Sequence, residues 1–470
     1  MDDPTGHAKK TPDIVTSLCP ECLKVIPGIV RENEGNVVME KTCPDHGPFQ
    51  TIISNDLSVY AKWRQAPRKI TKFTMPGSRV NRGCPHDCGL CPSHDQHTCL
   101  AILEVVSHCD LQCPVCLADA KPNGKFIDLK TLKSALKHLI ECEGDVTPLQ
   151  IGGGEPTLHP DLPSIVRETY RLGFDKIELD SNGLALAGDP GLSERLQEAG
   201  LSSVYLQMDG LSPEVSVFIR GRDLVEEKLS AIENCKNAGL EVILSVTVVP
   251  GVNDGKLWEM IQFGVEQGLT GVNFQAIALS GRFPEHLRDS AKRFTAGHFI
   301  QELEKQSDKR LLKNDFMPIP CPDPRCGLMS YMLIRNGDLI PLGRVVPEEH
   351  LMDIVADQSD WDLVIQQIHS NALNGCGCRR PWEKTFGQDA LCIGSDFFSV
   401  GFHGMMDAYS FDCERSRKCC VHELTWDGRL IPFCLYNIKY RHHHSTHDTT
   451  ARLDAASSGA DEALCKKGAP

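Results

Sequence analysis

Three cysteines at C-x3-C-x2-C spacing, Cys109, Cys113 and Cys116, form the most chemically specific pattern in this sequence. Three thiolates on one tight loop can hold three irons of a 4Fe-4S cubane, which leaves the fourth iron open to a ligand from outside the protein. An open iron implies a bound cofactor or substrate. Taken alone, the spacing also allows a zinc knuckle or a ferredoxin-like site.

Three polar motifs lie further along the chain. Gly152 to Pro156 reads Gly-Gly-Gly-Glu-Pro, in which glycines let the backbone approach a ligand closely and the Glu155 carboxylate can accept bonds from an ammonium group. The turns Asp180-Ser-Asn-Gly and Gln207-Met-Asp-Gly suit a ribose or an amino-acid moiety. Asp180 and Asp209 can equally be ordinary turn aspartates.

These motifs must be positioned by an alternation of short apolar runs and amphipathic segments. Six strands are predicted: Ala101 to Val106, Leu149 to Ile151, Lys176 to Asp180, Ser203 to Gln207, Glu241 to Val249 and Gly271 to Ile277. Five helices are predicted between them: Asp128 to Cys142, Asp161 to Leu172, Leu192 to Ala199, Asp223 to Ala238 and Asp254 to Gln267. Such alternation indicates parallel βα units of the α/β class.

Each motif directly follows one of the first four strands. Six βα units are too few for a closed eight-stranded barrel, so we expect an open, partial (β/α)6 TIM barrel. The carboxyl ends of parallel strands share one rim, where such folds carry their chemistry. The motifs are therefore expected to meet at that rim.

The C-x3-C-x2-C motif followed by Gly-Gly-Glu-Pro resembles the radical S-adenosylmethionine (SAM) superfamily over residues 100–320. The resemblance implies a radical SAM core at 101–320 that uses SAM and a 4Fe-4S cluster and cleaves SAM to a 5′-deoxyadenosyl radical. It implies the following roles: Cys109, Cys113 and Cys116 as cluster ligands; Gly153, Gly154, Glu155 and Pro156 around the SAM amino group; Asp180, Ser181 and Asn182 at the ribose; Gln207 and Asp209 at other parts of SAM or at the substrate.

The amino-terminal segment, assigned to a domain at 1–75, carries a second metal pattern. Cys19 and Cys22 are spaced C-x2-C, and Cys43 and His46 are spaced C-x2-H, with a β-hairpin predicted at 34–36 between the pairs. This pattern predicts one mononuclear tetrahedral ion, either structural zinc or rubredoxin-like iron. The spacing does not separate the two metals.

Residues 76–100 contain a third cysteine set, Cys84, Cys88 and Cys91, followed by Cys99. Four thiolates would close a cubane, so we predict an auxiliary 4Fe-4S cluster. In the alternative, Cys99 is a plain buried thiol and the fourth ligand comes from elsewhere.

The segment 321–440 is expected to form a cysteine-rich domain with hairpins at Asn336-Gly337 and Asp427-Gly428. Cys326, Cys419 and Cys434 lie beside these hairpins and are predicted to bind a further auxiliary cluster. Residues 441–470, including Cys465 and a histidine run, read as a flexible tail.

Composition limits the function classes. The chain has 470 residues, 22 cysteines and a formal net charge of -14. This charge disfavours nucleic-acid binding. The apolar runs are too short to span a bilayer, and the amino-terminal residues lack a signal sequence. We therefore expect a cytoplasmic enzyme, which associates peripherally with a membrane if its substrate is a lipid.

Over residues 15–440 the order of motifs resembles the archaeal tetraether lipid synthases and their bacterial relatives. That resemblance implies C–C coupling of lipid alkyl chains, in which a chain carbon is first attached to a sulfide of an auxiliary cluster, and a low-potential donor such as ferredoxin or flavodoxin. Members of the family have also been described as methyltransferases of a dihydropterin, which is the alternative function. A non-catalytic electron-transfer or metal scaffold is the third reading.

Overall fold

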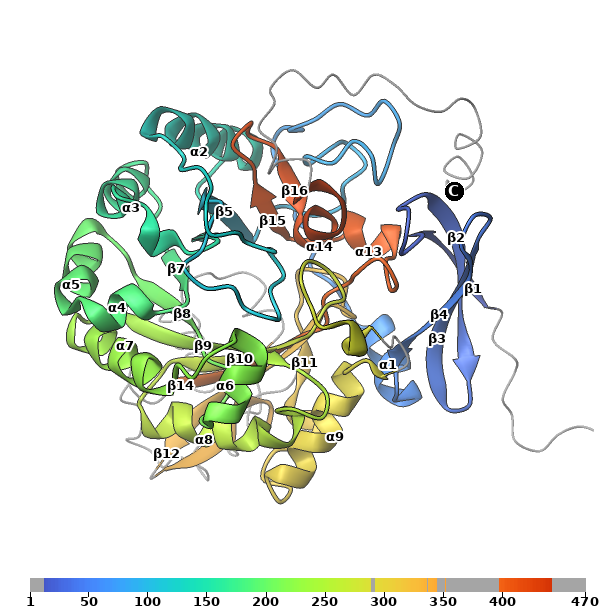
Figure 1. Ribbon diagram of the computed structural model, residues 1–470. Coiled ribbons are helices and arrows are strands. Elements are labelled where there is room, and N and C mark those ends of the chain that lie inside the picture. The colour runs from blue at the N-terminus through green and yellow to red at the C-terminus, as the bar shows by residue number, and fades with distance from the viewer. Residues whose placement is uncertain (1–11, 289–291, 336, 345–350, 352–396, 442–470) are drawn as a thin grey trace, which may run out of the picture.

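The computed structural model describes residues 12–288, 292–335, 337–344, 351 and 397–441, which form two sheets (Figure 1). The smaller sheet is antiparallel, in the order β1 (Asp13–Leu18), β2 (Val25–Asn33), β3 (Asn36–Cys43) and β4 (Gly47–Ser54). Its β2–β3 hairpin turns at Glu34 and Gly35, both with positive φ, as a two-residue turn requires. The predicted amino-terminal hairpin is therefore confirmed, and α1 (Leu57–Arg64) follows it.

All six predicted core strands are present and lie parallel, each beside the next in chain order. They are β5 (Leu100–Val106), β6 (Leu149–Gly153), β7 (Ile177–Ser181), β8 (Ser203–Gln207), β9 (Glu241–Val248) and β10 (Gly271–Ala276). The α/β fold with a parallel sheet is confirmed.

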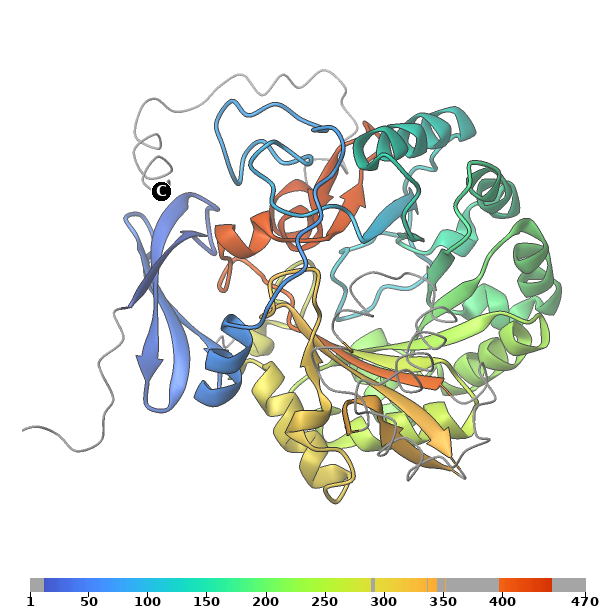
Figure 2. The same ribbon diagram turned by 180° about the vertical axis from the view of Figure 1, so that it is seen from behind.

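Helices cover the convex face of this sheet, as both ribbon views show (Figures 1 and 2). They are α2 (Leu129–Glu143), α3 (Leu162–Arg171), α4 (Leu184–Gly188), α5 (Pro190–Ala199), α7 (Val225–Asn237) and α8 (Leu257–Glu266), whereas α6 (Pro213–Arg220) packs against Val115 and Val249 in a separate cluster. Buried strand residues such as Leu149, Leu179 and Leu244 pack there against Leu136 of α2 and Ile232 of α7 in one core. Removing such side chains from water is the main favourable term for the fold.

Segments beyond residue 316 extend this sheet at both edges. The strand β14 (Phe397–His403) pairs in parallel with β10, and β12 (Gly327–Arg335), β11 (Met317–Pro318) and β13 (Asp338–Pro341) continue beyond it. At the other edge β15 (Val421–Leu424) pairs in parallel with β5, and β16 (Leu430–Pro432) follows. The two carboxy-terminal hairpins are confirmed, but they belong to the core sheet, so eight parallel strands lie in one row.

Short elements complete the described chain: α9 (Ala296–Gln306), α13 (Cys413–Arg417), α14 (Phe433–Leu435), η1 (Pro156–Leu158), η2 (Asp254–Lys256), η3 (Glu285–Leu287), η5 (Lys313–Asp315), η6 (Leu342–Arg344) and η7 (Tyr436–Tyr440). Among the described residues, no helix has both the length and the apolar character needed to cross a bilayer. The predicted tail beyond residue 441 and the cysteines at 376, 378, 392 and 465 lie outside the described residues.

Candidate active site and metal centres

The cysteine motif occupies the loop that leaves the carboxyl end of β5. Cys109 and Cys113 are buried, and the backbone of Cys116 exchanges two hydrogen bonds with Arg282, at 2.8 and 2.9 Å. The Arg282 Nε donates to the Cys113 carbonyl at 2.7 Å. A loop from the far end of the core therefore holds the motif in one conformation.

Polar donors surround the two buried thiols. The Leu111 N–H lies 3.3 Å from Cys109 Sγ, the Asn182 side-chain amide lies 3.9 Å from the same sulfur, and the Arg220 guanidinium hydrogen-bonds to Cys113. Burial, with smaller contributions from the nearby Glu155 and Asp110 carboxylates, raises the pKa of the Cys109 thiol to about 12, although the Leu111 N–H acts in the opposite direction. Donors aimed at sulfur stabilise a thiolate, so the loop fits a bound iron-sulfur cluster.

The glycines after β6 bring its end against the cysteine loop. The Gly154 N–H donates to the Val106 carbonyl and the Glu155 N–H to the His108 carbonyl, both at 2.9 Å. A Cβ on Gly154 would lie 2.1 Å from the His108 carbonyl oxygen, and Gly153 has a positive φ of 137°. We expected these glycines to let the backbone approach a ligand closely. In this structure they instead let it approach the main chain of Val106 and His108, at the start of the cysteine loop.

We expect Gly154→Ala to destabilise the protein by about 1 to 3 kcal/mol, because the added methyl group meets main-chain atoms that cannot rotate away. Gly188→Ala is the matched control, since a Cβ there meets open space at the end of α4. Urea unfolding midpoints of the two variants measure the difference. Equal midpoints would contradict the close-approach argument.

Glu155 joins the ends of β6 and β7. It is 1% exposed, and burial raises its carboxyl pKa. Oε1 accepts from the Thr157 N–H and hydroxyl and from the Ser181 hydroxyl at 2.8 Å. Among the described residues, Oε2 accepts one hydrogen bond, from the Asn182 N–H at 2.7 Å. Because Oε2 has spare acceptor capacity, it suits an ammonium donor. The predicted role of Glu155 at the SAM amino group stays a prediction.

Asp209 is fully engaged within the protein. Its carboxylate forms a bidentate ion pair with Arg220 at 2.6 and 2.9 Å, and it also accepts from the Thr247 N–H and the Gln207 side chain. Asp209 therefore positions Arg220 beside Cys113. Direct contact of Gln207 or Asp209 with SAM stays a prediction, as does ribose contact by Asp180.

Lys228 is a site residue that sequence reasoning missed. It is 3% exposed on α7, and its Nζ donates to the Asn182 carbonyl and to Gln207 Oε1. Burial, with a smaller contribution from Arg220, lowers its pKa to about 8. Leu224 and Ile232 lie four residues to either side and are also buried. A lysine in the apolar stripe of a helix was the signal that could have revealed it.

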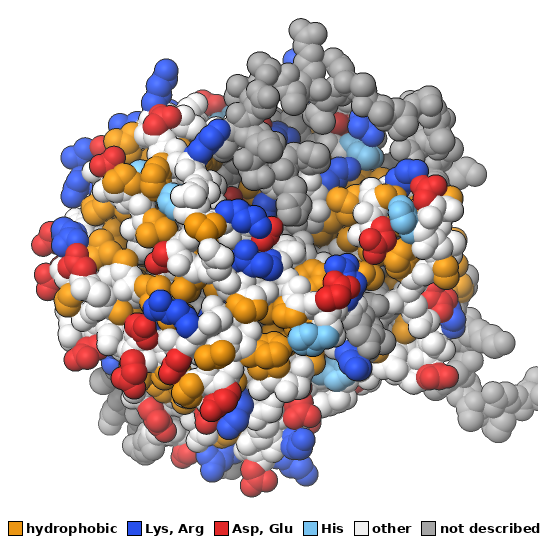
Figure 3. Space-filling view, viewed as in Figure 1, with side chains coloured by type: hydrophobic (Ala, Val, Ile, Leu, Met, Phe, Trp, Pro, Cys, Tyr) orange, Lys and Arg blue, Asp and Glu red, His pale blue; other side chains and the backbone are white. Residues whose placement is uncertain are grey.

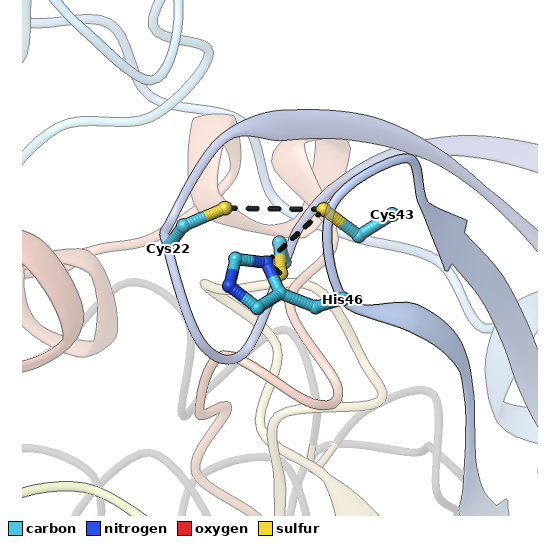
Figure 4. A group of neighbouring side chains, drawn as sticks. Cys22, Cys43 and His46 are labelled. Atoms are coloured by element: carbon cyan, nitrogen blue, oxygen red, sulfur yellow. Dashed lines mark hydrogen bonds between the residues drawn. The ribbon is translucent and has the colours of Figure 1, made fainter.

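The amino-terminal ligands come together as predicted. Figure 4 shows Cys22, Cys43 and His46 pointing toward one another. The ligand atoms of these residues and Cys19 all lie within 4.8 Å of one another, and the Cys22 and Cys43 sulfurs are 3.9 Å apart. At a metal–sulfur distance of about 2.3 Å, tetrahedral ligands are about this far apart.

The remaining cysteines are grouped differently from the sequence prediction. Cys84 hydrogen-bonds to Cys413 and Cys88, with Cys91 nearby, whereas Cys99 lies with Cys321 and Cys420. Cys99 thus lies with other thiols than the sequence suggested, and Cys413 on α13 lies beside Cys84 instead. That Cys84, Cys88 and Cys91 hold an auxiliary cluster stays a prediction. Cys99 immediately precedes β5, and Cys420 immediately precedes β15. Because β15 pairs in parallel with β5, the two cysteines lie side by side.

The three predicted thiols at the carboxy end lie in one neighbourhood, but their sulfurs do not all lie within 4.8 Å of one another. Cys419 and Cys434 interact electrostatically with each other and with Cys326, and burial raises the pKa of Cys434 to about 11. The Arg415 guanidinium lies 3.4 Å from Cys326 Sγ, and the Met406 N–H lies 3.4 Å from Cys434 Sγ. That these three thiols hold an auxiliary cluster stays a prediction.

Residues 78–264 match the family model of the radical SAM superfamily, and residues 11–55 match the HMPTM N-terminal zinc ribbon domain. A 7,8-dihydro-6-hydroxymethylpterin dimethyltransferase of Methanocaldococcus jannaschii is 33% identical over 90% of this chain and 93% of its own length. The chain belongs to the radical SAM superfamily. It is accordingly a radical SAM enzyme that uses SAM and a 4Fe-4S cluster, and it carries a zinc ribbon.

Further relatives cover a smaller share of this chain. A probable GTP 3′,8-cyclase of Methanothermobacter thermautotrophicus is 30% identical over 35% of this chain and 53% of its own length. Among solved structures, Streptococcus suis SuiB bound to S-adenosylmethionine is 14% identical, with a TM-score of 0.38 over 45% of this chain and 47% of that chain. Methylornithine synthase is 19% identical, with a TM-score of 0.36 over 46% of this chain and 64% of that chain.

Proposed function

We propose that this radical SAM enzyme attaches a methyl group to an unactivated carbon of a dihydropterin-like nitrogen heterocycle. The similarity to the pterin dimethyltransferase supports this class of substrate, because it covers 90% of this chain and so extends well beyond the radical SAM core. It favours the heterocycle over the lipid substrate that the sequence analysis placed first.

The main structural support for a polar substrate is the inner face of the parallel sheet, which is lined with polar side chains. Opposite the apolar face that packs against the helices, neighbouring strands place polar side chains side by side, such as Gln150 beside Glu178 and Asp180 beside Tyr205. Gln150 Nε2 donates to Glu178 at 2.6 Å, and the Tyr205 hydroxyl accepts from Gln275 at 2.7 Å. An alkyl chain against this wall would desolvate polar groups without pairing them.

Two carboxyl groups on this wall suit a ring with N–H donors. Glu423 on β15 is 1% exposed, and among the described residues neither of its oxygens has a hydrogen-bond partner. It interacts electrostatically with Glu104 and Asp180, and burial raises the pKa of Asp180 to about 7. The amino-pyrimidine edge of a pterin presents adjacent N–H donors, which a carboxyl pairs in a bidentate manner.

The chain's own residues hold the reactants at the rim. Cys109, Cys113 and Cys116 would ligate the cluster, Glu155 would orient the SAM amino group, and Arg220 would balance the charge at Cys113. When bound, the cluster and SAM supply hydrogen abstraction: one electron from a ferredoxin- or flavodoxin-like donor and one substrate C–H bond yield methionine, 5′-deoxyadenosine and a substrate carbon radical. Placement of the target carbon opposite the rim then depends on Glu423 and its neighbours.

Product analysis tests the proposal. Anaerobically reduced protein with SAM and 7,8-dihydro-6-hydroxymethylpterin is expected to release 5′-deoxyadenosine, and, in cell extract that supplies the methyl donor, to add one or two methyl groups to the pterin, as measured by mass spectrometry. Unmodified pterin in this assay would refute the proposal.

Glu423→Gln is expected to raise KM for the pterin about tenfold, because one buried hydrogen-bond pair is weakened. The exposed Glu194→Gln is the matched control.

Coupling of lipid alkyl chains is the second candidate, favoured by the location of Cys326, Cys419 and Cys434 in one neighbourhood. Three thiols would leave part of an auxiliary cluster accessible to a substrate, as the lipid-coupling chemistry of the resembling family requires. The same assay with dialkyl glycerol lipids separates the two functions. A product with two joined chains and two fewer hydrogen atoms would replace the pterin proposal.

A further inference from the structure

A second compact thiol group lies outside the SAM loop and the zinc ribbon. The sulfurs of Cys99, Cys321 and Cys420 all lie within 4.8 Å of one another. Among the described residues, this set and the zinc-ribbon set are the two groups of three or more ligand atoms that are so close together. The three residues are far apart in sequence, so the proximity of their sulfurs is a property of the tertiary structure.

We propose that Cys99, Cys321 and Cys420, with His97 as fourth ligand, bind one mononuclear zinc ion. His97 Nε2 lies 3.3 Å from Cys99 Sγ, and in the zinc ribbon His46 Nδ1 lies 3.5 Å from Cys43 Sγ. The three thiols, and the pair of His97 and Cys99, lie at spacings that suit ligands around one tetrahedral ion, about 3.8 Å for a metal–sulfur distance of about 2.3 Å. Three thiolates and one histidine are an established donor set for structural zinc.

Glu143 supports the assignment of His97. Its Oε2 lies 3.7 Å from His97 Nδ1, and its Oε1 accepts the Thr98 N–H at 2.9 Å, while the Glu143 side chain is only 3% exposed. A carboxylate beside one ring nitrogen fixes the other nitrogen toward the metal, as in carboxylate–histidine–zinc arrangements. His97 thus presents Nε2 to Cys99 and Nδ1 to Glu143.

The location indicates a structural role. Cys99 lies at the amino end of β5, whereas the cluster loop follows the carboxyl end, about 20 Å away for a seven-residue strand. The Cys99 N–H also donates to the Cys420 carbonyl at 2.8 Å, where β15 joins the sheet. An ion here would link three segments that each supply one thiolate: Cys99 before β5, Cys321 between β11 and β12, and Cys420 before β15.

Zinc and iron analysis of the full-length, anaerobically purified protein tests the site. Cys321→Ser is expected to lose one equivalent of zinc and no iron or sulfide, and Cys43→Ser in the zinc ribbon is expected to lose a different equivalent. Cys235→Ser is the matched control, because Cys235 is a buried thiol paired only with Ser193 among the described residues. Loss of iron and sulfide from Cys321→Ser, or retention of all zinc, would overturn the proposal.

His97 variants keep the test valid if Cys321→Ser does not fold. His97→Cys retains four ligands and is expected to keep the ion, whereas His97→Ala is expected to bind it at least about tenfold more weakly. After Co²⁺ replaces zinc, His97→Cys should intensify the thiolate-to-metal charge-transfer absorption. An unchanged cobalt spectrum, or equal zinc affinity of the two variants, would show that His97 is not a ligand.

Discussion

Replacing Cys113 by alanine is expected to abolish release of 5′-deoxyadenosine from SAM, lowering the rate by at least about a thousandfold, as when an irreplaceable catalytic group is removed. Cys113 is buried and hydrogen-bonded to Arg220, so no other thiol or water replaces its sulfur without repacking of the loop. Chromatographic measurement of 5′-deoxyadenosine after anaerobic reduction gives the rate. Iron analysis should show loss of one cluster.

Cys142→Ala is the matched control for this experiment. Cys142 is also fully buried, but it lies on α2, and its sulfur contacts His138 rather than a metal-binding group. It should cost stability without changing the cluster content. If Cys113→Ala cleaves SAM at the wild-type rate, the assignment of this loop as the SAM site is wrong.

Asp209→Asn is expected to destabilise the protein by about 3 kcal/mol or more, because it leaves the buried Arg220 charge without its partner. The side chains of Arg220 and Asp209 are 11% and 1% exposed, so water does not replace the lost interaction. SAM cleavage should fall as well, because Arg220 is then free to move away from Cys113. Unfolding midpoints and cleavage rates measure the two effects.

Asp189→Asn provides the matched control for an ion pair in solvent. Arg195 and Asp189 form a pair at 2.8 Å, but both side chains are more than half exposed. Exposed pairs contribute little because solvent screens them, so no measurable change in the midpoint is expected. Equal effects of Asp209→Asn and Asp189→Asn would contradict the argument from burial.

Surface charge agrees with the exclusion of nucleic acid. Figure 3 shows basic and acidic side chains interspersed over the face in view, without a continuous basic patch. With a net charge of -14, phosphate backbones would be repelled on average. The exclusion stays a prediction, which RNA binding at physiological salt would contradict.

Local patterns determined the strands, helices and short-range metal motifs. The six core strands and the Cys109 loop could be predicted because each is encoded within about ten consecutive residues, by apolar periodicity or by ligand spacing. The same holds for the zinc-ribbon pairs and the three hairpins. The glycine motif could also be recognised from its sequence pattern. Its contact with the main chain of the cysteine loop could not, and is seen only in the structure.

Long-range pairing was decided only by the tertiary structure. Cys413 completes the Cys84 set, and Cys420 joins Cys99, because residues beyond 396 add a parallel strand at each edge of the core sheet. Spacing along the chain carries no information about which loops meet at a sheet edge. The sequence by itself therefore indicated the chemistry of each cysteine motif, and the packing of distant strands decided which thiols lie close together.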